Sequence, residues 1–360
     1  MSVALENRLR ALFQRPVDAR GFATGPGFSV GTIKGPVREE NQDRAFVAHI
    51  VEGGSKPKEL LVAVVLDGMG GMHEGGEAAG IAASSFLAAL VRIPGPVAFR
   101  LEAGIQAANS AVFGKFAGRG GTTLTAVAFA EPRVAYAIHV GDSRLYRTSR
   151  SSEITLVTED QTVGSAIRDK KGTLDEDELD NRLLQFVGIG ADMAPSHFKF
   201  ADPDFSTWLL TTDGAHSLGR KALHGVLRPQ SPTESVVRRL LTAADNLGSD
   251  DNATAIAICP AQYRVEGPFF EGTTLRVWTP DKSLEIWLPE IAPKPLNPGG
   301  DHAANFVAHG LEEPKATEPK LPAKKSKTTK PRKKQREPKE AETSLRAGQL
   351  IITFGKEDDS

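Results

Sequence analysis

Hydrophobic residues alternate between strand-type runs and helix-type patterns from about residue 25 to residue 260. The run at 59–67, ELLVAVVLD, is almost continuously apolar and predicts a strand that is covered on both faces. Residues 75–90, GGEAAGIAASSFLAAL, predict a close-packed helix rich in Ala and Gly. The runs at 122–130 and 133–140 are separated by a tight turn and predict two strands.

A further helix is predicted from Ser231. Ser231 is a good N-cap, Pro232 suits the first helical position, and Glu234 completes a capping box. Gly248 is expected to end this helix.

The pattern of hydrophobic and polar residues also divides the whole chain into segments. Residues 1–24 predict an N-terminal extension with a short amphipathic helix, residues 25–261 a catalytic-sized domain, and residues 262–290 an added β-hairpin. Residues 291–345 have too little apolar content to offset the entropy of ordering them, so they predict a disordered basic linker rich in Pro and Lys.

Residues 346–360 regain an apolar run at 350–354, LIITF. A short apolar motif on a flexible linker is typical of a docking peptide that binds a protein partner. A terminal strand that packs back on the body explains the run equally well, and both interpretations stay open.

Composition narrows the class of protein. The chain has 360 residues, of which 40% are hydrophobic and 25% charged, and no apolar stretch has the length of a membrane-spanning helix. The N-terminus lacks a signal-peptide pattern, so we expect a cytoplasmic protein with no membrane partner. The single Cys259 excludes an internal disulfide and ends an apolar run, which indicates a buried thiol.

The net charge of −1 conceals an uneven distribution. Residues 315–339 hold nine Lys and two Arg against two Glu, a net charge of +9, which leaves −10 for the remaining residues. An acidic body with a basic tail predicts no specific nucleic-acid binding by the fold.

Three Asp residues lie at the ends of strongly apolar runs. Asp67 ends VVLDGMGG, Asp213 follows STWLLTT, and Asp251 precedes ATAIAIC. If the runs are neighbouring strands, the three carboxylates converge, and their repulsion requires a cation; oxygen ligands select Mg²⁺ or Mn²⁺. One Asp-Gly pair alone indicates a surface turn, but three such sites favour a metal centre.

Other kinds of site fit less well. The sequence has no P-loop, no H-E-x-x-H, no G-x-S-x-G and no calcium-binding loop, and its eight His residues lack metal-ligand spacing. His73 follows Asp67 in the same loop and is interpreted as a solvated histidine rather than as part of the site.

Six motifs in order resemble the metal-dependent protein phosphatases of type 2C in their bacterial form. These are VREENQDRAF, VVLDGMGGMHEGGEAA, GGTTLTAV, HVGDSRLYR, LLTTDGAHS and SDDNATAIAI, spread over about 25–260. The resemblance implies an α+β fold, a four-layer α/β/β/α sandwich with two central antiparallel sheets flanked by helices. It also implies a site for two Mn²⁺ or Mg²⁺ ions between the sheets.

The resemblance implies a role for each matching residue. Asp67 would bridge the two metals, the Gly68 carbonyl would bind one of them, and Asp213 and Asp251 would complete the ligands of the other metal. Asn252 would orient Asp251.

Further matches concern the phosphate and the outer metal ligands. The resemblance implies that Arg38 holds the substrate phosphate, that Asp43 acts on the metal waters, and that Asp142 binds a weaker third metal. Two departures are Gln42, where many members have a metal-binding Glu, and Met69, where many eukaryotic members have His.

The resemblance implies a phosphoserine and phosphothreonine protein phosphatase whose nucleophile is a metal-activated water. Its partners would be a phosphoprotein substrate and a bacterial Ser/Thr kinase that the phosphatase opposes. The alternative is a phosphatase-like regulator that binds a phosphoprotein or kinase with little turnover. Two features favour it: Gln42, and the loop GGMHEGGE, which is one residue longer than the common bacterial form.

Overall fold

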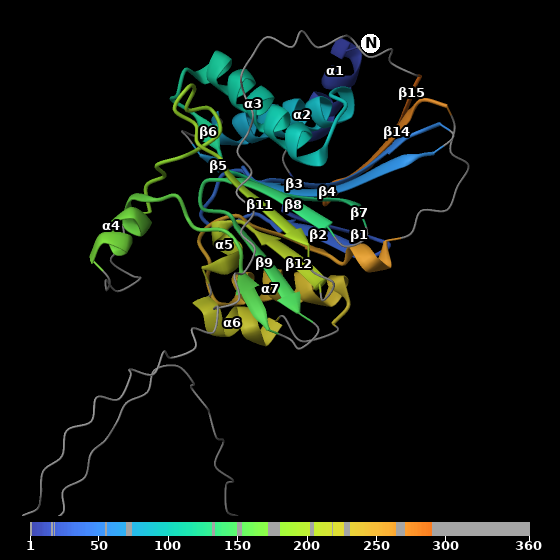
Figure 1. Ribbon diagram of the computed structural model, residues 1–360. Coiled ribbons are helices and arrows are strands. Elements are labelled where there is room, and N and C mark those ends of the chain that lie inside the picture. Colours follow the sequence, from blue (N-terminus) through green and yellow to red (C-terminus); the bar gives the residue numbers. More distant parts are fainter. Residues whose placement is uncertain are drawn as a thin grey trace, which may run out of the picture. The chain divides into compact units, whose positions relative to one another are not determined.

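Two antiparallel β-sheets pack face to face between two layers of helices (Figure 1). This arrangement comes from a computed structural model, and it confirms the predicted α+β fold with two central sheets. The structure describes residues 2–15, 17, 19–54, 56–69, 74–131, 134–149, 153–171, 181–201, 205–217, 219–226, 231–263 and 271–289.

Within these ranges, the first sheet has the strand order β1-β2-β13-β12-β9-β10. Its strands are β1 (Arg20–Gly25), β2 (Phe28–Ile33), β9 (Arg144–Ser149), β10 (Ile154–Leu156), β12 (Phe205–Thr211) and β13 (Ala253–Ile258).

The second sheet has the order β11-β8-β7-β4-β3-β14-β15. Its strands are β3 (Arg44–Glu52), β4 (Lys58–Leu66), β7 (Leu124–Glu131), β8 (Val134–Val140), β11 (Ser196–Ala201), β14 (Thr273–Trp278) and β15 (Ser283–Leu288). A short ribbon pairs β5 (Gly68–Met69) with β6 (Gly121–Thr122) beyond the end of β4.

Each sheet is covered by its own set of helices. The second sheet carries α1 (Ser2–Phe13), α2 (Glu74–Arg92) and α3 (Val97–Phe116), and the first sheet carries α5 (Asp213–His216), α6 (Gly219–Val226) and α7 (Thr233–Asn246). The helix α4 (Val163–Lys171) lies to one side of these layers, and a short 3₁₀ turn, Pro260–Gln262, follows β13 (Figure 1).

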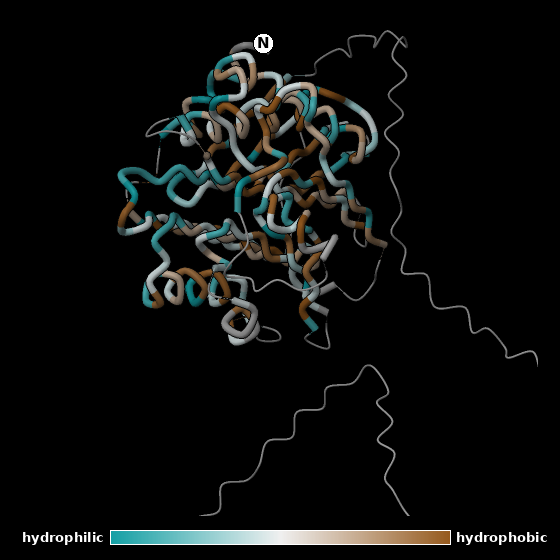
Figure 2. Tube along the Cα trace, turned by 90° about the vertical axis from the view of Figure 1, so that its left-hand side faces the viewer, coloured by the Kyte–Doolittle hydropathy of each residue, from teal (hydrophilic) through white to brown (hydrophobic). Residues whose placement is uncertain are grey.

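The continuous apolar run of β4 is explained by burial on both faces. Val62, Val64 and Leu66 contact the core beneath α1, α2 and α3, whereas Ala63 and Val65 contact the core between the sheets. Figure 2 shows the hydrophobic segments concentrated in these inner layers. Because side chains alternate across a strand, such a strand has no polar face.

The core between the sheets contains large aromatic side chains. Trp208 is fully buried and packs against Phe129 and Phe200, with ring centroids 5.9 and 5.4 Å apart respectively. Phe28 packs against Trp278 of β14, at 5.1 Å between centroids. Close packing of this kind fixes the spacing of the two sheets, and with it the spacing of the loops at their edges.

Both flanking segments contribute to the body. The helix α1 buries Leu5, Leu9 and Phe13 in the same core as α2 and α3. The hairpin β14–β15 extends the second sheet, since Val277 of β14 pairs with Ala48 of β3. The predictions for residues 291–345 and 346–360 lie outside the described residues.

The predicted start of α7, with Ser231 as the N-cap and Pro232 as the first helical residue, is wrong by one residue. The helix begins at Thr233, and Pro232, with φ −54° and ψ 141°, occupies the N-cap position without a side-chain cap hydrogen bond. The extended ψ of Pro232 keeps it out of the helix, and the Thr233 hydroxyl bonds to Ser29 at 3.1 Å. The predicted end is confirmed, because the helix stops before Gly248, whose φ is +81°.

Among the described residues, no helix combines the length and the hydropathy needed to cross a membrane.

Substitution Leu9→Ala tests whether α1 is an integral part of the body. Leu9 is fully buried, so removing its side chain should lower the free energy of unfolding by about 2–5 kcal/mol. The exposed Arg8 on the same helix provides the control, and Arg8→Ala should change stability by no more than about 0.5 kcal/mol. Equal chemical denaturation midpoints for the two variants would contradict the packing described for α1.

Candidate metal and phosphate site

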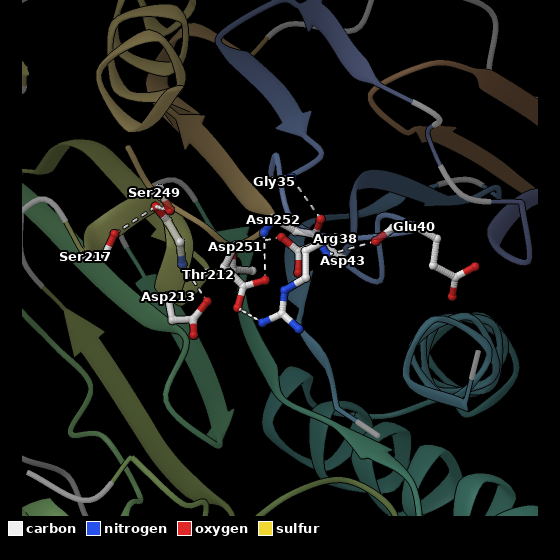
Figure 3. Close-up of polar contacts among 11 residues, drawn as sticks. Gly35, Arg38, Glu40, Asp43, Thr212, Asp213, Ser217, Ser249, Asp251 and Asn252 are labelled. Carbon is white, nitrogen blue, oxygen red and sulfur yellow. Dashed lines mark hydrogen bonds and ion pairs between the residues drawn. The ribbon is translucent and has the colours of Figure 1, made fainter. Parts of the chain in front are cut away.

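Two Asp residues reach the site from neighbouring strands of the first sheet. Strands β12 and β13 pair antiparallel, with Thr211 opposite Ala255, so the end of one lies beside the start of the other. Asp213 begins α5 just after β12, and Asp251 lies just before β13. Their side chains lie near each other at this edge (Figure 3).

Asp67 comes from the other sheet, at the end of β4. Its backbone N–H donates to Thr123 Oγ1 at 2.8 Å, and its carbonyl accepts from Thr123 N at 2.9 Å and from Thr122 Oγ1 at 2.8 Å. The GGTT motif thus holds the backbone that carries Asp67. The three acidic residues therefore converge across the space between the sheets rather than along one sheet.

The convergence has an electrostatic cost. Burial raises the pKa of Asp67 well above its usual range, and the nearby charges of Asp213, Asp43 and Asp142 raise it further. Burial and the charge of Asp251 raise the pKa of Asp213. The close approach of the two carboxyl groups raises the pKa of Asp67 further and lowers that of Asp213. Without a cation, this group favours bound protons because its charges repel.

Asp43 lies deepest in the cluster and is 4% exposed. Its Oδ2 accepts hydrogen bonds from Thr254 Oγ1 at 2.6 Å and Thr212 Oγ1 at 2.9 Å. Its Oδ1 is buried and has no hydrogen-bond partner. Burial, together with the charges of Asp213 and Asp251, raises the pKa of Asp43 to about 8.

Asp142 follows Gly141 in the turn between β8 and β9. Burial raises the pKa of Asp142 to about 7, and the charges of Asp213 and Asp160 add to this effect. The next residue, Ser143, is hydrogen-bonded to Thr123 at 2.7 Å between hydroxyl oxygens. The turn that carries Asp142 is thus tied to the segment that holds Asp67.

Arg38 is the cation that faces these carboxylates. Its guanidinium is about half exposed and forms an ion pair with Asp251 (Figure 3). This hydrogen bond, with the attraction of Asp251, Asp213 and Asp67, raises the pKa of Arg38 above its usual value. A half-exposed guanidinium that faces the site can bind an anion such as phosphate.

Gly68 lies in a position that only glycine can occupy. A Cβ on Gly68 would lie 2.3 Å from the Gly75 carbonyl oxygen and 2.8 Å from the Gln42 carbonyl oxygen. The side-chain oxygen of Gln42 lies beside Gly75, at the start of α2. Met69 belongs to β5, and His73 lies outside the described residues.

The residues present suit divalent cations by their chemistry. They supply oxygen donors, which hard ions prefer, and one buried carboxylate oxygen, Asp43 Oδ1, that has no partner. Within the described ranges, no three His, Cys, Asp or Glu side chains lie close enough together to form a metal-binding group. The fit therefore rests on the donor chemistry and on the orphaned oxygen, and the metal-binding role of each residue stays a prediction.

The sequence interpretation missed the hydroxyl groups that hold the acidic residues. Thr212 and Thr254 donate to Asp43, and Thr123 accepts from the backbone of Asp67. The sequence indicates these residues only by their position within the site motifs: Thr212 lies in TTD, Thr254 in NAT and Thr123 in GGTT. The backbone N–H of Asn252 donates to Asp251 Oδ1 at 2.7 Å, and the role of Asn252 in orienting Asp251 stays a prediction.

Solved structures of bacterial Ser/Thr phosphatases are similar to this chain. MsPP, a PPM Ser-Thr phosphatase from Mycobacterium smegmatis solved with cacodylate, is 28% identical with a TM-score of 0.52, and the match covers 66% of this chain and 99% of MsPP. The catalytic domain of PstP, solved with two manganese ions, is 24% identical with a TM-score of 0.54, over 67% and 99% of the two chains. Stp1 from Staphylococcus aureus is 20% identical with a TM-score of 0.56, and the match covers 70% of this chain and 99% of Stp1.

No family model and no curated protein sequence matches the chain. The structural comparison nevertheless confirms the fold class and the resemblance to bacterial PPM-family Ser/Thr phosphatases. The similarity to MsPP supports a phosphatase as the class of enzyme.

Thermal unfolding with and without Mn²⁺ tests the electrostatics of the site. Asp43 and Asp142 have pKa values of about 8 and about 7 in the folded chain, against 3.8 as the ordinary value. The folded state thus binds more protons than the unfolded state in this interval, and the contribution of these groups to stability falls as pH rises from about 4 to about 8. Mn²⁺ should offset the loss, so it should raise the Tm more at pH 8 than at pH 6.

At a hundredfold excess over Kd, the gain should be about 2.7 kcal/mol, or roughly 5–10 °C. Asp67→Asn should reduce both the Mn²⁺ shift and its pH dependence, whereas Asp245→Asn, at an exposed carboxylate paired with Arg20, should leave them unchanged. If Asp67→Asn responds to Mn²⁺ as the parent chain does, Asp67 is not part of a metal site.

Proposed function

We propose that this chain is a divalent-metal-dependent protein phosphatase that hydrolyses phosphoserine and phosphothreonine. The observation that carries this proposal is the position of the Arg38 guanidinium opposite acidic residues from both sheets, Asp67, Asp213 and Asp251. A phosphate group bound between a guanidinium and a carboxylate-lined cation site meets positive charge on both sides. The similarity to MsPP supports the same activity.

In this proposal, different residues of the chain would bind the metal ions and the phosphate. Asp67, Asp213 and Asp251, with the carbonyl of Gly68, would hold two Mn²⁺ or Mg²⁺ ions, and Asp142 would contribute to a third. When bound, such ions supply a nucleophilic water at neutral pH and offset the charge of the phosphate.

Arg38 would bind two phosphate oxygens through its planar guanidinium and hold the phosphorus in line for attack. Asp43 would accept a hydrogen bond from a water molecule through Oδ1, since its Oδ2 is already bonded to Thr212 and Thr254. In this position Asp43 would orient the water by hydrogen bonding.

The substrate of such an enzyme is a phosphoprotein, so a Ser/Thr kinase would act upstream of it. A cytoplasmic location and opposition to a bacterial kinase remain proposals.

Turnover of a small phosphate ester provides the first test. We expect hydrolysis of p-nitrophenyl phosphate and of a phosphothreonine peptide to require Mn²⁺, and the substitutions Asp67→Ala and Asp213→Ala to lower kcat/KM by at least about 10³-fold. Arg38→Ala should chiefly raise KM, because it removes a contact with the phosphate. If the folded parent protein binds Mn²⁺ but releases no phosphate, the result would favour a phosphatase-like regulator and contradict the proposal that the chain is a phosphatase.

Removal of residues 300–360 tests where the activity resides. All the site residues lie before residue 253, so we expect kcat and KM for p-nitrophenyl phosphate to change by less than about twofold. A substantial loss of kcat on the small ester would show that the removed segment takes part in catalysis.

A further inference from the structure

The segment that carries Arg38 forms an exposed arch between two attached ends. Gly35 is buried, whereas 36–39 are exposed, and Glu40 is partly buried. A turn hydrogen bond from Arg38 N to Gly35 O, at 3.2 Å, shapes the arch from within. The position of Arg38 therefore depends on how the two ends are fixed.

One buried side chain binds both ends of the arch. Asn252 is 4% exposed; its Oδ1 accepts from the backbone N–H of Gly35 at 3.1 Å, and its Nδ2 donates to the Glu40 carbonyl at 3.4 Å (Figure 3). The sheet places it there, because Ile33 at the end of β2 pairs with Ala253 at the start of β13.

Gly35 packs directly on the backbone before Asn252. A Cβ on Gly35 would lie 2.5 Å from the Asp250 carbonyl oxygen and 2.6 Å from the Asp251 carbonyl oxygen. These distances exclude any larger residue unless the arch lifts away. The close approach and the two amide hydrogen bonds are independent observations, and both join the arch to the turn that carries Asp251.

We propose that Asn252 is a positioning residue that holds Arg38 over the acidic cluster, and that Gly35 is required for the same contact. This inference rests on the proposed function, and it deepens it by naming how the phosphate-binding group is set relative to Asp251. Loss of the amide would free both ends of the arch, and displacement of a binding group by about 1 Å can reduce a rate up to about a hundredfold.

Asn252→Ala should raise KM for p-nitrophenyl phosphate about tenfold and weaken inhibition by inorganic phosphate to the same extent, with a smaller change in kcat. Gly35→Ala should likewise raise KM and weaken inhibition by inorganic phosphate. In the Arg38→Ala background, adding Asn252→Ala should change KM by less than about twofold, because the group that Asn252 positions is already absent.

Two measurements separate this role from a general structural one. The affinity for Mn²⁺, measured by calorimetry, should be unchanged in Asn252→Ala, whereas Asp251→Ala should reduce it. Asn109→Ala is a matched control, because Asn109 is also buried and binds both Gly188 N, at 2.8 Å, and Gly190 O, at 2.7 Å. It should lower stability and leave KM and phosphate inhibition unchanged.

An additional rise of KM in the double variant, or a fall in Mn²⁺ affinity in Asn252→Ala, would overturn the inference. If the parent chain has no turnover but binds inorganic phosphate with Mn²⁺, the proposed function fails, and weaker phosphate binding by Asn252→Ala still supports the positioning role. Absence of both turnover and phosphate binding in the parent chain would overturn both proposals.

Discussion

Repulsion between buried carboxylates is the constraint on which the site depends. Asp67 and Asp213 approach each other from different sheets. Burial raises the pKa of both, and repulsion adds to this effect, from the charge of Asp213 at Asp67 and from the charge of Asp251 at Asp213. A fold that brings such groups together loses stability unless protons or cations offset their charge. Divalent cations remove this cost and at the same time supply the chemistry of phosphate ester hydrolysis.

The fold meets this constraint with rigid supports around the acidic residues. The packed core between the sheets sets the distance between the loops, and threonine hydroxyls fix Asp43 and the backbone of Asp67. Arg38 supplies a positive charge at the open side of the cluster. Asn252 joins the Arg38 arch to the turn that carries Asp251, so the proposed metal-binding and phosphate-binding parts of the site share one structural support.

Much of the fold, and part of the candidate site, could be predicted from the sequence. The continuous apolar run of β4 indicated burial on both faces, and the structure shows it between two cores. The convergence of Asp213 and Asp251 follows from strand pairing, but Asp67 lies in the other sheet, and periodicity along one chain does not reveal which strands share a sheet. The roles of Thr212, Thr254 and Asn252 depend on contacts between residues up to 217 positions apart, which local patterns do not encode. The start of α7 was misplaced because Ser231 and Glu234 form a capping box in sequence, whereas the extended ψ of Pro232 shifts the first turn.

The central claim is that divalent cations hold acidic side chains from both sheets together. The most direct measurement is a crystal structure of the full chain soaked with Mn²⁺, with anomalous scattering recorded at the manganese edge. The account predicts anomalous peaks between Asp67 on one side and Asp213 and Asp251 on the other, with Gly68 O as a further ligand. Peaks elsewhere, or ordered side chains of these residues with no manganese between them, would contradict it.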